Sequence, residues 1–321
     1  MSCRSALILH GGAWDIPDAE VPDHLTGMAQ ALEVGRRALL EGRSALEVVV
    51  AVIRVLEEHP AFDAGVGAVL NRAGQIQLDA GLMDGHTLEF GAVACVQRIR
   101  YPIEAAYHIL RHGRGQYSLL VGPYAEAYAE AHGLEMVLPE FFLTERERER
   151  FLRLEAEVHY HSSRAFRGGG LPMGTVGCVA LDQAGRIAAG TSTGGAPYVI
   201  PGRVGDSPLP GCGYYATSHG GASATGWGEA IARLLLSAEA VRALEEGLPA
   251  QDAAERALRR LVERVRDPDG YPAAAGLIVL DAQGRFGVAH SAPRMAYARW
   301  SSDGDFCMTV AESKLDGGMR A

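Results

Sequence analysis

Lysine is almost absent from this sequence: among 321 residues, Lys314 is the only one. Enzymes that form a Schiff base with their substrate, and enzymes that hold phosphate in a P-loop, need a buried and positioned lysine. Lys314 lies in the C-terminal tail of the sequence, outside any apolar run. The sequence therefore argues against both classes of enzyme.

Cysteines are few, odd in number and without C-x-x-C spacing. This pattern favours a reduced, cytoplasmic protein without a disulfide framework or a zinc ribbon. The five are Cys3, Cys95, Cys178, Cys212 and Cys307.

Long apolar runs are also missing. None approaches the roughly 20 residues that span a bilayer, and the N-terminal run ALIL is too short for a signal peptide. The net charge of −9 argues against nucleic acid or an anionic membrane as a partner. Because 48% of the residues are apolar, however, the chain can fill a substantial core.

Apolar spacing predicts alternating strands and helices in the first half of the chain. Ser44 is placed to cap the second helix, and Pro102 and Pro123 fall near the first turns of the third and fourth. The expected strands are 6–12, a hairpin within 67–79 that turns at 72–74, and 90–99; the expected helices are 25–42, 44–60, 101–113 and 123–133.

Residues 136–174 differ in composition from the rest. A run of alternating Glu and Arg with a capping-box pattern, Thr144 and Glu147, gives way to an Arg- and Gly-rich stretch without apolar periodicity. We expect a solvated helix followed by a flexible linker.

Two segments beyond this linker repeat one pattern. Residues 177–187 and 276–286 share a glycine, an apolar run, Leu-Asp, a turn that ends in Gly-Arg, and an apolar return. Each predicts a β-hairpin. Their nearly continuous apolar strands indicate sheets that are covered on both faces, with helices outside.

Thr175 follows Gly174 where the glycine-rich chain meets the first of these strands. Threonine often opens a strand, and the position alone carries no function. The other interpretation is that the Thr175 hydroxyl attacks the carbonyl of Gly174 and cuts the chain, since glycine tolerates the strained backbone required. The new α-amino group, with an unperturbed pKa of roughly 7.7–8.0, would then act as general base for the adjacent hydroxyl.

Four ordered motifs in the second half resemble the plant-type asparaginase and isoaspartyl peptidase family of N-terminal-nucleophile hydrolases. The motifs are GTVGCVALD from residue 174, TSTGG from 191, GRVGDSP from 202 and ATGWGE from 224. The first half agrees, with LILHGGA from residue 7 and FDAGVGAVLNRAGQIQLDAGLMDG from residue 62. The resemblance extends from about residue 7 to about residue 279, except in the linker.

The resemblance implies the catalytic roles position by position. Thr175 matches the nucleophile, which is freed by cleavage after Gly174, and Thr193 matches the residue that orients it. Thr225 and Gly226 match the oxyanion hole, a hydroxyl and a backbone N–H aimed at developing negative charge. Gly228 falls where the backbone approaches the substrate closely, at the start of an expected helix whose N-terminus favours anions.

Substrate recognition is implied for Arg203 and Asp206. An arginine fork binds a carboxylate bidentately and an aspartate accepts from an ammonium group, so the pair suits a zwitterionic amino acid. The sequence departs from the family pattern at Asp63, where asparagine is usual near the nucleophile, at Trp227, where a small or polar residue is usual, and at Met173, where histidine is frequent.

Three other interpretations compete. GTSTG at 190–194 formally matches a nucleophile elbow with Ser192, but Pro197 and Pro201 prevent the helix that should follow. His159 and His161 form an H-x-H pair of the kind that binds a metal ion, but no carboxylate or cysteine is evident as a further ligand, which favours a solvated linker. A non-catalytic amino-acid-binding protein that never processes would keep Arg203 and Asp206.

We expect an α+β chain folded as a four-layer αββα sandwich of the N-terminal-nucleophile type, cut into residues 1–174 and 175–321. The resemblance implies hydrolysis of L-asparagine or of β-aspartyl dipeptides through an acyl-threonine intermediate. It also implies a homodimer of cleaved protomers and, in place of a catalytic cofactor, at most a structural sodium ion held by backbone carbonyls between Leu56 and Gly67.

Overall fold

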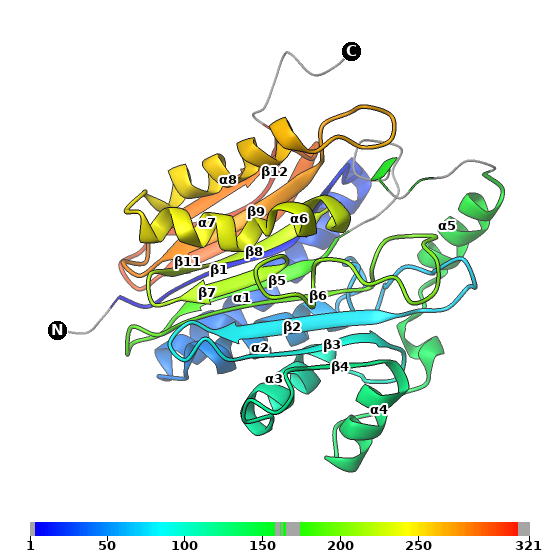
Figure 1. Cartoon of the computed structure of the whole chain (residues 1–321), viewed down its shortest axis with the longest axis horizontal. Coiled ribbons are helices and arrows are strands. Elements are labelled where there is room, and N and C mark those ends of the chain that lie inside the picture. The colour runs from blue at the N-terminus through cyan, green and yellow to red at the C-terminus, as the bar shows by residue number, and fades with distance from the viewer. Residues whose placement is uncertain (1–3, 158–160, 162, 165–173, 314–321) are drawn as a thin grey trace.

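Two β-sheets face each other in the computed structural model, which describes residues 4–157, 161, 163–164 and 174–313 (Figure 1). The larger sheet has eight strands in the order β12-β11-β1-β5-β6-β2-β3-β4, antiparallel throughout except for β3 and β4. These strands are β12 (Phe306–Glu312), β11 (Arg294–Ser301), β1 (Ala6–Trp14), β5 (Val176–Leu181), β6 (Ile187–Thr193), β2 (Leu78–Asp84), β3 (Phe90–Val96) and β4 (Leu119–Val121). The smaller antiparallel sheet consists of β10 (Phe286–His290), β9 (Ala275–Asp281), β8 (Gly220–Gly226) and β7 (Tyr214–Thr217).

Helices pack on the outer face of each sheet (Figure 1). The larger sheet carries α1 (Val21–Leu40), α2 (Ala45–Glu58), α3 (Pro102–His112) and α4 (Gly122–Ala131). Helices α6 (Gly228–Leu234), α7 (Leu236–Glu245) and α8 (Ala250–Arg264) lie on the smaller sheet. Short 3-10 turns occupy Asp18–Glu20 and Pro139–Phe142, and α5 spans Glu145–Glu155. The result is an α+β arrangement with one apolar cluster around α1, α2 and α3 and another between the sheets and under α6 to α8.

Local sequence signals account for several of these boundaries. Helix α2 begins after Ser44, whose hydroxyl accepts from the backbone N–H of Glu47 while the Glu47 carboxylate accepts from the N–H of Ser44 (3.0 Å). Prolines stand in the first turns of α3 and α4, as expected from the sequence.

The repeated pattern forms two hairpins of the same construction. In the first, Asp182 Oδ1 accepts from the N–H groups of Ala184 (2.9 Å) and Arg186 (3.0 Å). In the second, Asp281 Oδ1 accepts in the same way from the second and fourth residues after it, both at 2.9 Å. The two hairpins belong to different sheets, since β5 and β6 lie in the larger one and β9 and β10 in the smaller one.

The hairpin expected within residues 67–79 is wrong. The described chain has no strand between residues 67 and 77, and β2 begins only at Leu78. The expected turn at 72–74 does form, because Asn71 Oδ1 accepts from the N–H groups of Ala73 (2.9 Å) and Gln75 (3.1 Å), as Asp182 and Asp281 do in the two hairpins. Only the flanking strands are missing, so the apolar pattern on either side of this turn was not a guide to strand pairing.

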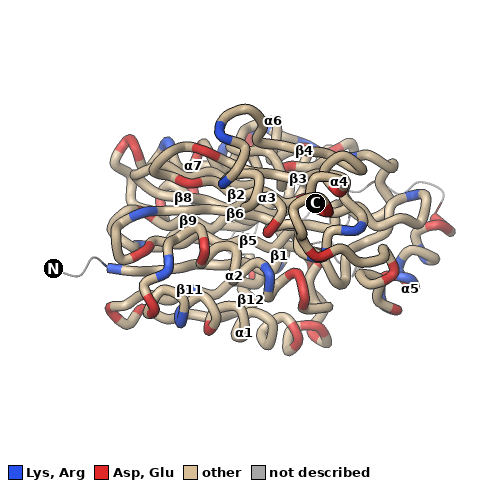
Figure 2. The backbone as a smooth tube through the Cα atoms, turned by 90° about the horizontal axis from the view of Figure 1, so that it is seen from below, with Lys and Arg blue, Asp and Glu red and all other residues tan. Residues whose placement is uncertain are grey.

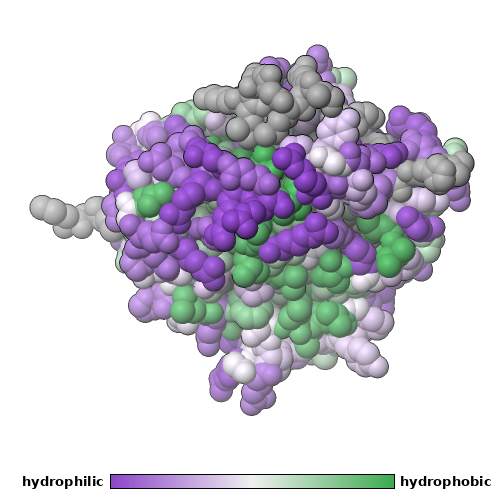
Figure 3. Space-filling view, turned by 45° about the horizontal axis from the view of Figure 1, so that its top comes forward, coloured by the Kyte–Doolittle hydropathy of each residue, from purple (hydrophilic) through white to green (hydrophobic). Residues whose placement is uncertain are grey.

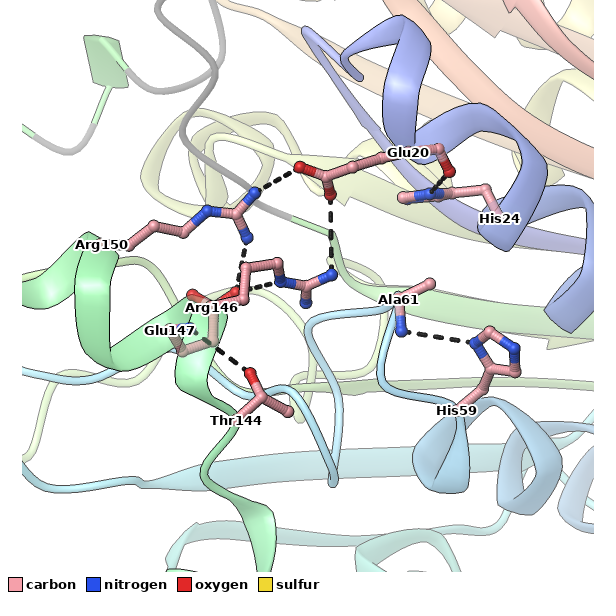
Figure 4. Close-up of polar contacts among 8 residues, drawn as sticks. All are labelled: Glu20, His24, His59, Ala61, Thr144, Arg146, Glu147 and Arg150. Atoms are coloured by element: carbon pink, nitrogen blue, oxygen red, sulfur yellow. Dashed lines mark hydrogen bonds and ion pairs between the residues drawn. The ribbon is translucent and has the colours of Figure 1, made fainter.

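Helix α5 carries the Glu/Arg run and is less solvated than expected (Figure 4). Glu147 and Arg150 are only 2% and 4% exposed. Glu147 Oε1 lies 2.8 Å from Arg146 Nε and 2.5 Å from Arg150 Nη1, and Arg150 Nη2 lies 2.6 Å from Glu20 Oε1. Buried charges of this kind need such paired geometry to offset their desolvation. The network therefore fixes α5 against the 3-10 turn before α1.

Acidic and basic residues are interspersed along the described chain, without a long segment of one sign (Figure 2). Hydrophilic residues cover much of the face seen in Figure 3, and apolar ones gather toward its lower part. Among the described helices, none is both long and apolar enough to cross a membrane.

Gly177 provides a test of how tightly the two sheets are packed. A Cβ on this β5 residue would lie 2.0 Å from Ser223 Oγ and 2.4 Å from His10 Nε2, two buried groups that bond each other at 2.9 Å. We expect Gly177→Ala to lower the free energy of unfolding by about 1–3 kcal/mol, measured by urea denaturation. Removal of the hydroxyl in the double variant Gly177→Ala/Ser223→Ala should restore part of the loss. An unchanged unfolding midpoint in the single variant would contradict this packing.

Candidate active site

Thr175 lies directly before β5, in the interior of the larger sheet and close to the residue at which the neighbouring strand β6 ends. Its hydroxyl is buried and donates to Thr193 Oγ1 at 3.3 Å. The two residues come together because β5 and β6 are antiparallel neighbours in which Val176 pairs with Ser192. The repeated hairpin therefore sets the geometry of the expected nucleophile and of its orienting residue.

Thr193 and Ser207 hold the Thr175 hydroxyl from two sides. Thr193 Oγ1 also accepts from the N–H of Gly195 at 3.0 Å, which fixes the hydroxyl that accepts the hydrogen bond of Thr175. Ser207 Oγ lies 3.4 Å from Thr175 Oγ1. Sequence reasoning missed Ser207, because a serine beside Asp206 in a Pro/Gly-rich loop is typical of a turn. The signal that could have found it was its place within the GRVGDSP motif.

A single pocket collects most of the residues that the sequence singles out. Its lining comes from Gly174, Thr175, Thr193, Gly195, Ala196, Arg203, Asp206, Ser207 and Gly226. Thus the expected cleavage site, nucleophile, substrate-binding pair and oxyanion-hole glycine, although far apart in sequence, share one concave site.

Arg203 already binds a carboxylate of its own chain. Its Nε and Nη2 donate to the two carboxylate oxygens of Glu229 at 2.8 and 2.9 Å. Burial would lower the pKa of Arg203, but the hydrogen bonds and charge of Glu229 raise it above its ordinary value. Sequence reasoning missed Glu229, although it stands in ATGWGE, where the start of α6 directs its side chain to the loop.

Asp206 is buried beside this pair. Its Oδ2 has no hydrogen-bond partner among the described residues. Burial raises the pKa of Asp206 to about 7, although the charge of Arg203 opposes the shift. An ammonium group that entered the pocket would favour the carboxylate and supply the missing partner.

The two expected oxyanion donors lie where β8 ends. Thr225 is fully buried, and its Oγ1 has no partner within the described part of the chain. Gly226 has a φ of +133° and lines the pocket. Gly228 borders the loop at residues 203–206, here called the recognition loop, since a Cβ at Gly228 would lie 2.8 Å from Arg203 Nη2. Trp227 is not among the residues that line the pocket and is buried in the core.

Asp63 adjoins the Gly174–Thr175 bond. Its Oδ1 accepts from the N–H of Val69 at 3.0 Å, its carbonyl accepts from the N–H of Gly194 at 2.9 Å, and its Oδ2 has no partner in the described residues. Burial raises the pKa of Asp63 well above its ordinary value, against the opposing effect of the N–H groups of Val69 and Gly174. A neutral carboxyl can act as a hydrogen-bond donor, which an ionised one cannot.

The nucleophile elbow at Ser192 is wrong. Ser192 lies within β6, and its hydroxyl donates at 2.6 Å to Glu57, a buried residue of α2. A strand that continues through the serine does not form the strand–turn–helix that the elbow requires. For the H-x-H pair, His159 lies outside the described residues and His161 Nδ1 bonds Ser163 Oγ at 2.8 Å. No group of three or more His, Cys, Asp or Glu in the described chain is arranged to hold a metal ion.

Comparison with known proteins covers nearly the whole chain. The family described as Asparaginase matches residues 3–309. The isoaspartyl peptidase of Salmonella typhimurium is 38% identical over 311 residues, which cover 94% of this chain and 96% of that protein. The plant-type L-asparaginase of Pyrococcus abyssi is 36% identical over 302 residues, 91% of this chain and 95% of that protein. An isoaspartyl peptidase/L-asparaginase of Danio rerio is 36% identical over 294 residues, 91% of each chain. The matched region includes every residue of the pocket.

The buried carboxyl of Asp63 leads to a prediction about pH. Because its pKa is raised in the folded state, its contribution to stability is fully present below the unfolded value and is lost as pH rises through the folded value. Asp63→Asn should therefore gain thermal stability relative to the wild type as pH rises from about 4 to about 9. The measurement is the melting temperature of both proteins across this range, with Asp252→Asn on the exposed face of α8 as control. A difference that stays constant with pH would refute it.

Proposed function

The chain belongs to the asparaginase family, and from that membership we propose that it is a self-processing amidohydrolase with Thr175 as its nucleophile. It hydrolyses L-asparagine to L-aspartate and ammonia, and cleaves the isopeptide bond of β-aspartyl dipeptides. The carrying observation is the buried Thr175 hydroxyl, bonded to Thr193 at 3.3 Å in a pocket that also contains Arg203 and Asp206.

Processing comes first in this proposal. Thr175 Oγ1 attacks the carbonyl carbon of Gly174, and the acyl group moves from nitrogen to oxygen. Water then hydrolyses the resulting ester, which leaves a carboxylate on Gly174 and a free α-amino group on Thr175. Both residues line the pocket, which supports this assignment. The products are residues 1–174 and 175–321.

Turnover uses the same hydroxyl. The α-amino group of Thr175 removes the hydroxyl proton as the oxygen attacks the side-chain carbonyl of the substrate, and ammonia or the amine of the dipeptide leaves. Water then releases L-aspartate from the acyl-threonine. Thr225 and Gly226 stabilise the developing oxyanion. This role is supported by the lack of a partner for Thr225 Oγ1 among the described residues, because a buried hydroxyl without a partner is costly unless a ligand supplies one.

Substrate recognition follows from the charges of the loop. Arg203 binds the α-carboxylate and Asp206 the α-ammonium group, with Gly228 leaving room beside them. The incoming carboxylate shares or replaces the Glu229 contact, because two of the guanidinium nitrogens already donate to Glu229. The roles of Arg203 and Asp206 thus follow from the family, while the affinity for substrate depends on how well its α-carboxylate competes with Glu229 for Arg203.

The same proposal includes the finer architecture. We infer that the sheets and their outer helices form the four-layer αββα sandwich of N-terminal-nucleophile hydrolases, supported by helices on the outer face of each facing sheet. We infer a homodimer of cleaved protomers from the family resemblance, and sedimentation of the processed protein tests it.

The segment between Leu56 and Gly67 fits a structural sodium ion. The carbonyl oxygens of Pro60 and Phe62 converge at Gly67, where each would lie 2.7 Å from an added Cβ. Hard cations prefer oxygen ligands of this kind. These carbonyls would hold the ion and would thereby stiffen the loop that carries Asp63.

Replacement of the nucleophile tests the proposal directly. The wild-type protein, incubated near neutral pH, should give two fragments by intact-mass spectrometry, the second beginning at Thr175. Thr175→Ala should remain one inactive chain, because it lacks the attacking hydroxyl. Two fragments from this variant would remove Thr175 as the nucleophile. A wild-type chain that stays whole and binds L-aspartate without turnover would support the amino-acid-binding alternative.

Arg203 provides a second test, on recognition. Arg203→Ala should still process but should raise KM at least about tenfold, since a charge-assisted hydrogen bond contributes about 1.5–3 kcal/mol. Steady-state kinetics of asparagine hydrolysis measures this change. Arg242→Ala on the exposed side of α7 is the matched control. Failure of Arg203→Ala to process would mean that Arg203 shapes the fold instead of binding the substrate.

A further inference from the structure

Asp79 is a buried acid that lies within the motif from residue 62 but has no role assigned by the family resemblance. It lies in β2, is 2% exposed, and pairs in register with Thr193 of the neighbouring strand. Thus its backbone adjoins the residue that receives the hydrogen bond of Thr175. Its carboxylate, however, accepts from backbone N–H groups of two other segments, β3 and the 203–206 loop.

On one side, Asp79 supports a bulge in β3. Leu78 pairs with Val96 but Ala80 pairs with Val93, so one extra residue of β3 lies opposite Asp79. Cys95, within this bulge, has a φ of +54°, a left-handed conformation that is strained for a non-glycine residue. Asp79 Oδ1 accepts the N–H of Cys95 at 2.8 Å and thereby stabilises the bulge. Bulges next to active sites commonly redirect a side chain.

On the other side, Asp79 faces the recognition loop. The backbone N–H of Gly205 bonds its carboxylate, and the positive charge of Arg203 acts on it. Burial raises the pKa of Asp79 to about 6, while Cys95, Arg203 and Gly205 oppose the rise. The titratable groups that face it are Arg203 and Asp206 of the loop and the Cys95 thiol of β3.

We propose that Asp79 is a positioning residue for substrate binding: its carboxylate, anchored by the β3 bulge, holds the 203–206 loop and balances the charge of Arg203. The inference rests on the proposed function, because Arg203 and Asp206 are taken to grip the amino-acid end of the substrate. The residue that would position Arg203 and Asp206 thus comes from the first half of the chain, before the expected cleavage site in sequence.

Asp79→Asn tests this role with a matched control. The amide keeps an acceptor for Cys95 but presents no negative charge to Arg203 and Gly205. Asp84→Asn is the control, since Asp84 ends the same strand and bonds the N–H of His86 instead. We expect KM for asparagine and Kd for L-aspartate to rise about tenfold in Asp79→Asn. We expect kcat to change by less than about twofold, because Thr175 and Thr193 are untouched.

The pH dependence separates positioning from a merely structural effect. Because Asp79 loses its charge below about pH 6, the ratio of the variant Kd to the wild-type Kd for L-aspartate, measured by calorimetry, should be largest near pH 8 and approach one below pH 6. A ratio that is the same at all pH values, or a ratio of one throughout, would overturn the proposal.

A second variant covers the case in which Asp79→Asn does not fold. Glycine adopts the left-handed conformation without strain, so Asp79→Asn/Cys95→Gly should keep the bulge and show the same pH-dependent loss of affinity. Wild-type affinity in this double variant would refute the role of Asp79. Binding of L-aspartate needs no turnover. A wild-type protein that binds but does not hydrolyse would therefore refute the proposed function alone, and one that does not bind would refute the positioning role.

Discussion

One buried guanidinium surrounded by three carboxyl groups organises the site. Arg203 donates twice to Glu229, and it lies within electrostatic reach of Asp206 and Asp79. Burial raises the pKa values of Asp206 and Asp79, to about 7 and about 6, and the charge of Arg203, which is paired with the half-exposed Glu229, only partly opposes the rise. The pocket is thus preset to receive a further positive charge, which suits the ammonium group of an amino acid. These acids come from three separate elements, so the arrangement also ties β2, the recognition loop and α6 together.

Close packing of the two sheets supports Thr175, the proposed nucleophile, from the side of β1 and β8. Gly177 allows His10 and Ser223 to meet at 2.9 Å beneath the start of β5, where any larger residue would collide with both. A rigid strand after Thr175 has a functional consequence: if the chain is cut before Thr175, its hydroxyl stays fixed by Thr193 while the preceding segment is free to leave. Rigid elements hold catalytic groups more accurately than loops do.

Helix α5 shows that a charged run need not be a solvated one. Glu147 and Arg150 are buried and pair with Arg146 and Glu20 from a distant segment (Figure 4). The same network acts on the site electrostatically, because the charge of Glu147 raises the pKa of Asp63 and that of Arg146 lowers it. Helix α5 is therefore bound to the body of the protein by charge pairs as well as by its chain connection.

The sequence by itself determined the local elements and the chemistry at the second-half motifs. Caps such as Ser44 and the repeated hairpins depend on interactions within a few residues, and Thr175, Thr193, Arg203 and Asp206 were identifiable from short motifs. Only the tertiary structure decided which groups meet. The turn at 72–74 formed without its flanking strands, Ser207 and Glu229 joined the site, and Asp79 faced the 203–206 loop while it bonded a bulge of β3. The contacts of Ser207, Glu229 and Asp79 depend on strand order and sheet packing, which join residues from 26 to more than a hundred positions apart and leave no period in the sequence.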